Sequence, residues 1–324
     1  MKQQNRRKGR PALMEANAAA LFAAMGMACI TALRLFLPAQ WSAAEAAVVW
    51  DALQGLLYIG LAARMTHTIR PSAREKRLRL SPPTIAQGML TLLAICAGVL
   101  FTDDLTLLTG AFLQRLGLNV SRHVAAGQYA PTYLYVLRVL ASGVLPAISA
   151  GWLWHGTMLS AWERRGTRYA VLTVAALGAL LSGSVVTLPA AFMLLLAAGC
   201  IAARTGSLLL SVSMHMGVLV AGIAARQIQS AIGVQAARFG RLWRELGGKQ
   251  GAGLLALETV LLGLAFLFLI RAVCSARPHE PAPWKNRPAR IVQMDAAEVF
   301  VLAAAVVTAL AVLFIDFLRM AGML

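Results

Sequence analysis

Charged residues are scarce in this sequence. Of its 324 residues, 13% are charged and 59% are hydrophobic, and the mean hydropathy is +0.69. Soluble globular domains carry about 25% charged and about 45–50% apolar residues. So few charges cannot cover a water-facing surface, which excludes a soluble globular enzyme. The same composition excludes a disordered chain, because disordered segments are poor in apolar residues.

Acidic residues are the rarer charge, and the motifs of common enzyme classes are missing. Only 13 Asp and Glu stand against 30 Lys and Arg, which gives a formal net charge of +17. The sequence contains no HExxH, GxSxG, P-loop or GxGxxG pattern. None of its four cysteines has a CxxC partner or a histidine at metal-ligand spacing: Cys29, Cys96, Cys200 and Cys274. We predict that they pack as small apolar side chains and form no disulfide framework.

Long apolar runs, by contrast, recur along the chain. A bilayer core about 30 Å thick is crossed by about 20 apolar residues of helix. Such runs lie at Ala18–Leu37, Ala43–Ala63, Thr84–Leu100, Pro131–Trp154, Tyr169–Ala203, Leu208–Ala224, Gly253–Ala272 and Ala297–Phe317. The long fifth run is read as two helices, because Ser182, Gly183 and Pro189 supply a turn near its middle. The sequence therefore predicts an all-α polytopic membrane bundle of eight or nine transmembrane helices.

Basic residues lie mainly in segments that nine alternating spans place on one side of the membrane. Twenty of the 30 Lys and Arg fall in Met1–Arg10, Arg64–Arg79, Trp162–Arg168, Arg204 and Arg271–Arg290. The positive-inside rule makes this side cytoplasmic, which places the N-terminus inside and both Asp103 and Asp104 outside. The charge is then a topology signal and a contact with anionic lipids of the cytoplasmic leaflet, not a nucleic-acid site. We expect a multi-pass protein of the cell membrane.

One basic segment disobeys this topology. Residues 226–249 carry five basic residues against Glu245, yet nine spans place them outside. Merging the double run into one span would bring this segment inside, but it would expel Arg204 and the basic residues of Arg271–Arg290. We therefore expect an amphipathic helix in the outer interface, with Phe239 and Trp243 as anchors.

Ionisable residues within the predicted spans are functional candidates, because charge is costly inside a membrane. They are Arg34, Glu45, Asp51, Arg138, His155, His215, Glu258 and Asp316. The first three and the last lie near span ends, where snorkelling or a first-turn position accounts for them. Glu258 sits centrally and needs a partner, for which Arg138 is one candidate.

His215 follows a recognisable helix boundary. In Arg204-Thr205-Gly206-Ser207, glycine suits a helix C-terminus and serine suits the N-cap of the next helix. Eight residues past Ser207, His215 lies about 12 Å into that helix. A neutral imidazole there can bind a metal, act as a general base, or form a hydrogen bond to a neighbouring helix.

The stretch Pro146–Gly166, with Trp152-Leu153-Trp154-His155-Gly156 and Trp162-Glu163-Arg164-Arg165-Gly166, resembles the first motif of the CPBP family. These are the CAAX protease and bacteriocin-processing intramembrane metalloproteases, also called Abi-like. Leu188–Ser207 resembles the family's helix ending in an RTGS turn, and Leu208–His215 resembles its final histidine helix. The resemblance spans about 137–224 and implies glutamates and histidines that activate a water for peptide hydrolysis with zinc.

Most of the family's catalytic residues are missing at the matching positions of this sequence. In the EExxxR motif, Ala150 and Gly151 stand at the glutamate positions and His155 at the arginine position. The FxxxH motif is expected near Leu180 and Ser184, and neither of its residues is present. His215 matches the first position of HxxxN or HxxxD, but Leu219 stands at the last. The remaining catalytic candidates are His215 and His155, and His215 is the candidate metal ligand. We expect no cofactor, or zinc if the family activity is retained.

Three functions are compatible with these residues. The favoured one is a CPBP-like membrane protein without proteolysis that binds a membrane partner or a hydrophobic peptide. An alternative is an active metallopeptidase that uses His215 and His155 with Glu163 or Glu258 as base, although Glu163 lies among arginines typical of a solvated charge cluster. A transporter is the third, against which stand the lack of internal repeats and the few intramembrane charges.

The predicted organisation of the chain has three parts. Residues 1–130 hold a basic tail and three transmembrane helices with an interfacial segment. Residues 131–224 form the CPBP-like core. Residues 225–324 hold the basic amphipathic segment and two C-terminal transmembrane helices.

Overall fold

Helices make up nearly all of the computed structural model, which describes residues 10–33, 43–69, 74, 78–120, 131–231, 249–276 and 296–323. The α-helices are α2 (Arg10–Leu33), α3 (Ala43–Thr68), α5 (Ile85–Arg115), α7 (Thr132–Arg138), α8 (Leu145–Ala150), α9 (Leu159–Trp162), α10 (Thr167–Leu180), α11 (Leu188–Thr205), α12 (Leu208–Ala231), α14 (Lys249–Ser275) and α15 (Ala296–Met320). Two π-helical stretches, η2 (Val139–Val144) and η3 (Gly151–Met158), and the 3-10 turn η4 (Glu163–Arg165) join α7, α8 and α9 into one rod.

Eight helical stretches of the described chain are long and apolar enough to cross a membrane, and α10 is a shorter apolar helix. This confirms the predicted polytopic α-helical membrane bundle. The long fifth run is divided as predicted, because α10 ends at Leu180 and α11 begins at Leu188. Within the described ranges the only extended pairing is a single bridge between Leu80 and Ser207. The predicted division of the chain at residues 130 and 224 stays a prediction.

Several helices run past the predicted span ends. Asp103 and Asp104 lie inside α5, which continues from the predicted end at Leu100 to Arg115. Arg226 lies inside α12, which continues to Ala231, and not at the start of an interfacial helix. The charges that interrupt these two apolar runs pair across the helices, since Arg226 Nη1 lies 3.3 Å from Asp103 Oδ1. The expected anchors Phe239 and Trp243, like Arg34, lie outside the described residues.

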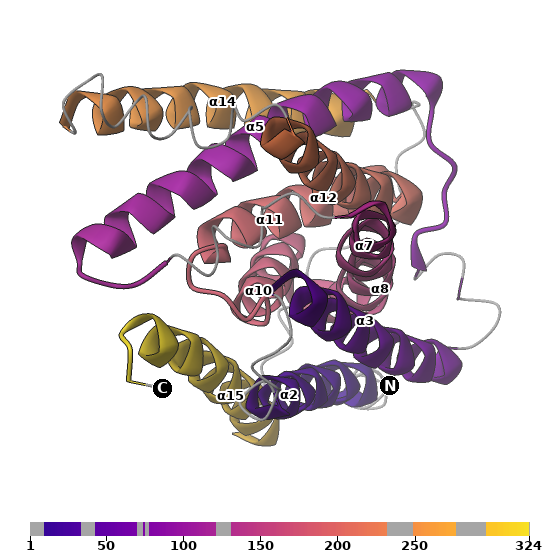
Figure 1. Ribbon diagram of the computed structural model, residues 1–324. Helices are drawn as coiled ribbons and strands as arrows, with labels where there is room; N and C mark the ends of the chain where they lie inside the picture. Colours follow the sequence, from indigo (N-terminus) through magenta and orange to yellow (C-terminus); the bar gives the residue numbers. More distant parts are fainter. Residues whose placement is uncertain are drawn as a thin grey trace, which may run out of the picture.

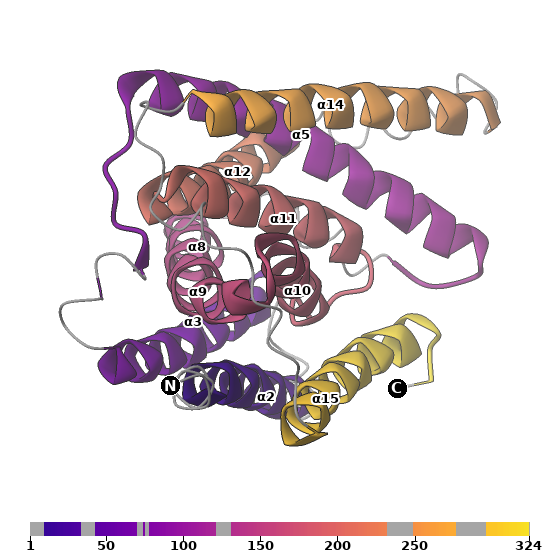
Figure 2. The same ribbon diagram turned by 180° about the vertical axis from the view of Figure 1, so that it is seen from behind.

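Two pairs of helices flank a central group. In both views α2 and α15 lie side by side along one edge, while α5 and α14 cross each other along the opposite edge (Figures 1 and 2). A first apolar cluster joins α2, α3, α10 and α15 with the rod of 132–165, and includes the buried Trp154 and Trp162. A second joins α5, α11, α12 and α14 around Phe266 and Met214. The functional candidates lie between these clusters.

Contacts between helices define two ends of the bundle. At one end, the start of α2 meets the end of α3, where Thr68 Oγ1 donates to Glu15 Oε2 at 3.1 Å. The same end holds the Leu80–Ser207 bridge, and we call it the strap end. At the opposite end, the far end, the ends of α5 and α15 pack against Val186.

The rod of 132–165 owes its π-helical turns to its sequence. Pro146 has no N–H group, so one i→i−4 hydrogen bond cannot form, and the preceding stretch η2 opens to the wider π geometry. Glycines then let α12 approach the rod closely. A Cβ at Gly143 would lie 2.8 Å from Val220 Cγ2, and a Cβ at Gly151 only 2.4 Å from Val212 Cγ2.

Polar side chains of two other helices bond to the backbone of the connection between α10 and α11. With 14 residues, α10 is about 21 Å long, shorter than the hydrocarbon core of about 30 Å. Gln54 Nε2 donates to the Leu181 carbonyl at 3.0 Å, and the Val185 N–H donates to Asp316 Oδ2 at 2.9 Å. Asp316 is therefore more than the span-end charge predicted from sequence, since backbone groups within a membrane need such partners.

Candidate functional site

Two histidines meet at the boundary between the two apolar clusters. His155 on η3 is fully buried and His215 on α12 is 7% exposed, and their ring centroids lie 6.4 Å apart. Ser211 lies one turn before His215, and its Oγ is 3.0 Å from His155 Nδ1. Gly199 on α11 leaves room for the His155 ring, which a Cβ there would contact at 3.9 Å. We call His155, Ser211 and His215 the histidine cluster.

Hydrogen bonding fixes the state of the His155 ring. Ser211 Oγ donates its single hydrogen to the Ala198 carbonyl at 2.9 Å. The contact with His155 therefore runs from Nδ1–H to Ser211 Oγ, which leaves Nε2 without a proton in the neutral ring. His155 Nε2 and His215 Nδ1 are buried and form no hydrogen bond to any described residue, although the Leu195 backbone lies beside the His155 ring. One nitrogen of each ring is thus left for water or another hydrogen-bond partner.

A buried ion pair lies next to this cluster at the strap end. The Arg79 guanidinium pairs with Glu163 Oε2 and donates from Nη1 to the Ala202 carbonyl at 2.9 Å. Arg79 is 4% exposed, and the side chain of Glu163 is 20% exposed. The Ala202 carbonyl belongs to the last turn of α11, where the helix dipole favours a cation. Glu163 is therefore held by Arg79, which corrects the prediction of a solvated charge cluster.

The segment Leu78–Ser81, which we call the strap, is fastened to the turn between α11 and α12. The Leu208 N–H donates to the Arg79 carbonyl at 2.7 Å, and the Ser81 N–H donates to the Gly206 carbonyl at 3.3 Å. Gly206 is left-handed with φ 68°. Arg79 also has a left-handed φ of 59°, unlike every other described non-glycine residue. The strap thus joins the loop after α3 to the boundary that precedes His215.

An apolar groove runs beside the strap. It encloses about 280 Å³ and is lined only by apolar side chains, from the strap, the rod and α12: Leu78, Leu80, Ile148, Trp152, Leu208 and Val212. Trp152 is held by a hydrogen bond from its Nε1 to Thr66 Oγ1 at 3.0 Å. The groove is chemically suited to an apolar segment and offers no group for reaction.

The family-motif positions are only partly brought together. Gly151 lies against Val212, one residue from Ser211, so it belongs to the same region as the histidine cluster. Ala150 is buried in the first apolar cluster. Leu219 packs in the second apolar cluster, so an apolar side chain takes the last position of the third motif.

The second-motif positions lie elsewhere. Val171 on α10 and His155 both face Gly199. The histidine cluster therefore lies beside Val171 along the length of α10. Leu180 lies nine residues further along that helix, about 14 Å away. Ser184 follows in the turn that Asp316 caps, next to Val185. The structure therefore brings together His155 and His215 but not Leu180 or Ser184.

Zinc does not fit the residues at this site. A catalytic zinc needs about three protein ligands and an open position for water. Nowhere in the described ranges do three His, Cys, Asp or Glu side chains gather around one point. The histidine cluster supplies two imidazoles and a hydroxyl, and the adjacent carboxylate of Glu163 is held by Arg79.

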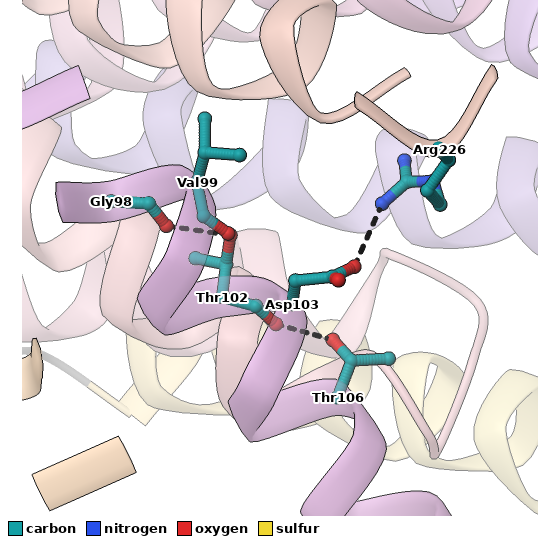
Figure 3. A network of polar contacts seen from close by, with 6 residues as sticks. All are labelled: Gly98, Val99, Thr102, Asp103, Thr106 and Arg226. Carbon is teal, nitrogen blue, oxygen red and sulfur yellow. Dashed lines mark hydrogen bonds and ion pairs between the residues drawn. The ribbon is translucent and has the colours of Figure 1, made fainter. Parts of the chain in front are cut away.

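A second set of charges lies away from the strap end, and we call it the charged set: Asp51, Asp103, Arg138 and Arg226. Asp103 on α5 points toward Arg226 on α12, beside Thr102 and Thr106 (Figure 3). Both threonine hydroxyls donate at 2.7 Å to carbonyls one turn back in their own helix. Arg138 interacts electrostatically with Arg226 and with Asp51. These side chains come from four different helices and are only partly buried.

Sequence reasoning missed Ser211 and Arg79 as site residues, and it missed the partner of Glu163. Ser211 stands four residues before His215, a spacing that places two polar groups on one helix face and could have indicated it. Arg79 was interpreted only as part of a basic loop, and Glu163 as an alternative base or a solvated surface charge. Their pairing joins positions 84 residues apart, and no local pattern indicates it.

Comparisons with known proteins add no assignment. The chain matches no protein-family model, no curated protein and no solved structure. The resemblance to the CPBP family therefore depends on the motif residues alone.

Proposed function

We propose that this integral membrane protein has a CPBP-like core that has lost peptidase chemistry and binds a hydrophobic peptide, or a hydrophobic segment of a membrane partner, in the apolar groove. This proposal depends on one observation, which is the lack of space for a glutamate side chain at position 151 of the first motif. A Cβ at Gly151 would lie 2.4 Å from Val212 Cγ2, closer than real side chains approach, so a glutamate there would need Val212 to shift. At this position the carboxylate is absent and the space for it is taken by the Val212 side chain.

The groove supports the binding part of the proposal. Its lining of leucine, isoleucine, valine and tryptophan side chains favours an apolar ligand, and apolar pockets with few polar groups are the usual form of such sites. The fixed indole of Trp152 gives the groove one rigid wall. The histidine cluster behind it offers hydrogen-bonding nitrogens but no carboxylate to activate water.

The proposed orientation places the strap end in the cytoplasm. Arg79, Arg164, Arg165 and Arg204 are all near this end, at the strap, at the end of the rod and in the last turn of α11. Positive residues at one end favour the cytoplasmic side and contact with anionic lipids there.

The peptidase part is tested on the purified full chain in liposomes. Prenylated and transmembrane peptides are offered with and without added zinc, and products and bound metal are measured. We expect neither cleavage nor stoichiometric zinc. Zinc bound at one equivalent, together with turnover that His215→Ala abolishes, would overturn the proposal.

The binding part needs a separate measurement with a matched control. A photoreactive benzophenone amino acid replaces Trp152 in the groove or Phe300 on α15, which is 73% exposed. We expect a hydrophobic peptide to be captured at position 152 at least about tenfold more than at position 300, a ratio equivalent to about 1.4 kcal/mol. Equal capture at both positions would mean that peptides merely sample the lipid-facing surface.

A further inference from the structure

We infer that the strap, Leu78–Ser81, is the gate between the apolar groove and the histidine cluster, and that the Arg79–Glu163 ion pair is the latch that keeps it closed. This inference rests on the proposed function, since it assigns the regulation of the same groove. It concerns how a ligand in the groove reaches the histidine cluster, which lies behind the groove wall.

The side chains of the strap face alternately toward the groove and toward the interior of the bundle. Leu78 and Leu80 both line the groove, while Arg79 between them turns its side chain inward to Glu163 and Ala202. Withdrawal of Arg79 would therefore move both leucines with it, and the groove would lose one wall.

The histidine cluster lies directly behind that wall. Leu78 Cδ2 and Leu208 Cδ2 both lie against Gly156, where a Cβ would contact them at 3.6 and 3.5 Å. Gly156 is the next residue after His155, and Arg79 is close enough to act electrostatically on the His155 ring. With the strap docked, Leu78 is 9% exposed and His155 is not exposed at all.

The latch holds the strap without satisfying all of its polar groups. Arg79 Nε and Glu163 Oε1 are buried, and neither forms a hydrogen bond to a described residue. Arg79 also has a left-handed backbone conformation, which is unfavourable for any residue with a Cβ. A buried network that is only partly satisfied is less stable than a complete one. The closed strap is thus held by the ion pair, the hydrogen bond to Ala202 and two backbone hydrogen bonds, against two unfavourable features.

The chain that follows the strap suits a movement of this segment alone. After Ser81, the two prolines Pro82 and Pro83 lead into Thr84, whose side chain caps α5 by accepting from the Gln87 N–H at 3.2 Å. The start of α5 is therefore fixed independently of the strap. The two backbone hydrogen bonds that form the bridge to residues 206–208 would be released together.

A disulfide across the bridge tests the gate. Leu80 and Ser207 form a non-hydrogen-bonded antiparallel pair, because the flanking hydrogen bonds join Arg79 with Leu208 and Ser81 with Gly206. Such pairs have Cα atoms about 4.5 Å apart, within the range that disulfides span. The double variant Leu80→Cys/Ser207→Cys is made with the four native cysteines replaced by alanine.

The readout is labelling by an alkyl diazirine dissolved in the bilayer, mapped by mass spectrometry in the full chain. We expect Trp152 and Val212 to be labelled in every variant, because they line the groove. Labelling of His155 and Ser211 should rise about tenfold in Arg79→Ala, equivalent to about 1.4 kcal/mol. Oxidised Leu80→Cys/Ser207→Cys should suppress this rise when combined with Arg79→Ala, and reduction should restore it.

The outcomes separate the gate from the groove. If the cross-linked, reduced and Arg79→Ala proteins label His155 and Ser211 equally, the gate is overturned while the groove stands. If Trp152 and Val212 are not labelled in any variant, the groove itself fails, and the proposed function fails with it. Glu163→Gln removes the charge but keeps the shape, and it should raise the labelling of His155 and Ser211 even if Arg79→Ala does not fold.

Discussion

Two arginine–aspartate or arginine–glutamate pairs join distant parts of this chain, and they differ chiefly in burial. Arg79 and Glu163 at the strap end have side chains 3% and 20% exposed. Arg226 and Asp103 in the charged set have side chains 36% and 30% exposed. In the first pair, Arg79 also donates to the Ala202 carbonyl. In the second, Arg226 lies near Arg138, which carries the same positive charge.

Burial determines what each pair contributes. Removal of one partner from a buried pair leaves an uncompensated charge and costs about 3–5 kcal/mol, whereas an exposed pair contributes about 0–1 kcal/mol. A pair that is costly to break can hold a segment in one position, as proposed for the strap. A pair that contributes little can be accommodated along α5 and α12 without fixing their relative position.

The largest expected effect is at Arg79. Arg79→Ala removes the ion pair and the bond to Ala202, and it leaves Glu163 partly buried beside a helix C-terminus. We expect a loss of about 3 kcal/mol in the free energy of unfolding, at the low end for a buried pair because Glu163 retains some solvent contact. Unfolding by denaturing detergent in mixed micelles measures this loss.

Glu163→Gln is the matched control for Arg79→Ala. It keeps an oxygen that accepts from Arg79, so we expect a smaller loss than for Arg79→Ala. Equal stability of wild type and Arg79→Ala would show that burial does not distinguish the two pairs.

The next effect concerns the close packing at the strap end. In Gly151→Ala, the new Cβ meets Val212 Cγ2 at 2.4 Å, and overpacking of this kind costs about 1–3 kcal/mol. Val212→Ala should restore most of that loss in the double variant, which a double-mutant cycle measures.

Gly60 on α3 is the matched control glycine. A Cβ there contacts nothing within 4 Å, so Gly60→Ala should be neutral or stabilise by up to about 1 kcal/mol through helix propensity. A loss at Gly60 equal to that at Gly151 would refute the packing argument.

A smaller effect is expected within the histidine cluster. Ser211→Ala leaves the Ala198 carbonyl and His155 Nδ1–H without their shared partner, at a cost of about 1–2 kcal/mol. The ¹⁵N chemical shifts of the His155 ring should also change, because the hydroxyl that selects the Nδ1–H form is gone. Ser213→Ala, at a half-buried position on the same helix, is the control and should leave those shifts in place.

The helices of this fold were predictable from the sequence, but several of their ends were not, and α5 gives a physical reason. Hydropathy identifies α2, α3, α14 and α15 because each is a continuous apolar run. It ends α5 too early, since Asp103 and Asp104 lower the local hydropathy without breaking the helix. The compensating Arg226 lies 123 residues away, beyond any local window.

The candidate site was predictable only in its separate members. The RTGS turn and the depth of His215 could be inferred from local sequence, and the structure places Gly206 and Ser207 at that helix boundary. The neighbour of His215, His155, comes from a different segment, and so does the partner of Arg79. Arg79 in particular lies in a basic run, where composition indicates an exposed loop, yet Glu163 and the end of α11 bury it. Tertiary pairing thus reversed the local expectation.

The smallest expected effect is at Arg226. Arg226→Ala removes the ion pair with Asp103 but also removes a like charge that acts on Arg138, so the gain and the loss partly cancel. We expect a change below about 1 kcal/mol in the free energy of unfolding, as for other partly exposed pairs. In a double-mutant cycle with Asp103→Asn, the coupling energy should be smaller than that between Arg79→Ala and Glu163→Gln. A coupling at Arg226 as large as that at Arg79 would mean that both pairs fix their helices, and the strap would then lose its distinction as the one latched segment.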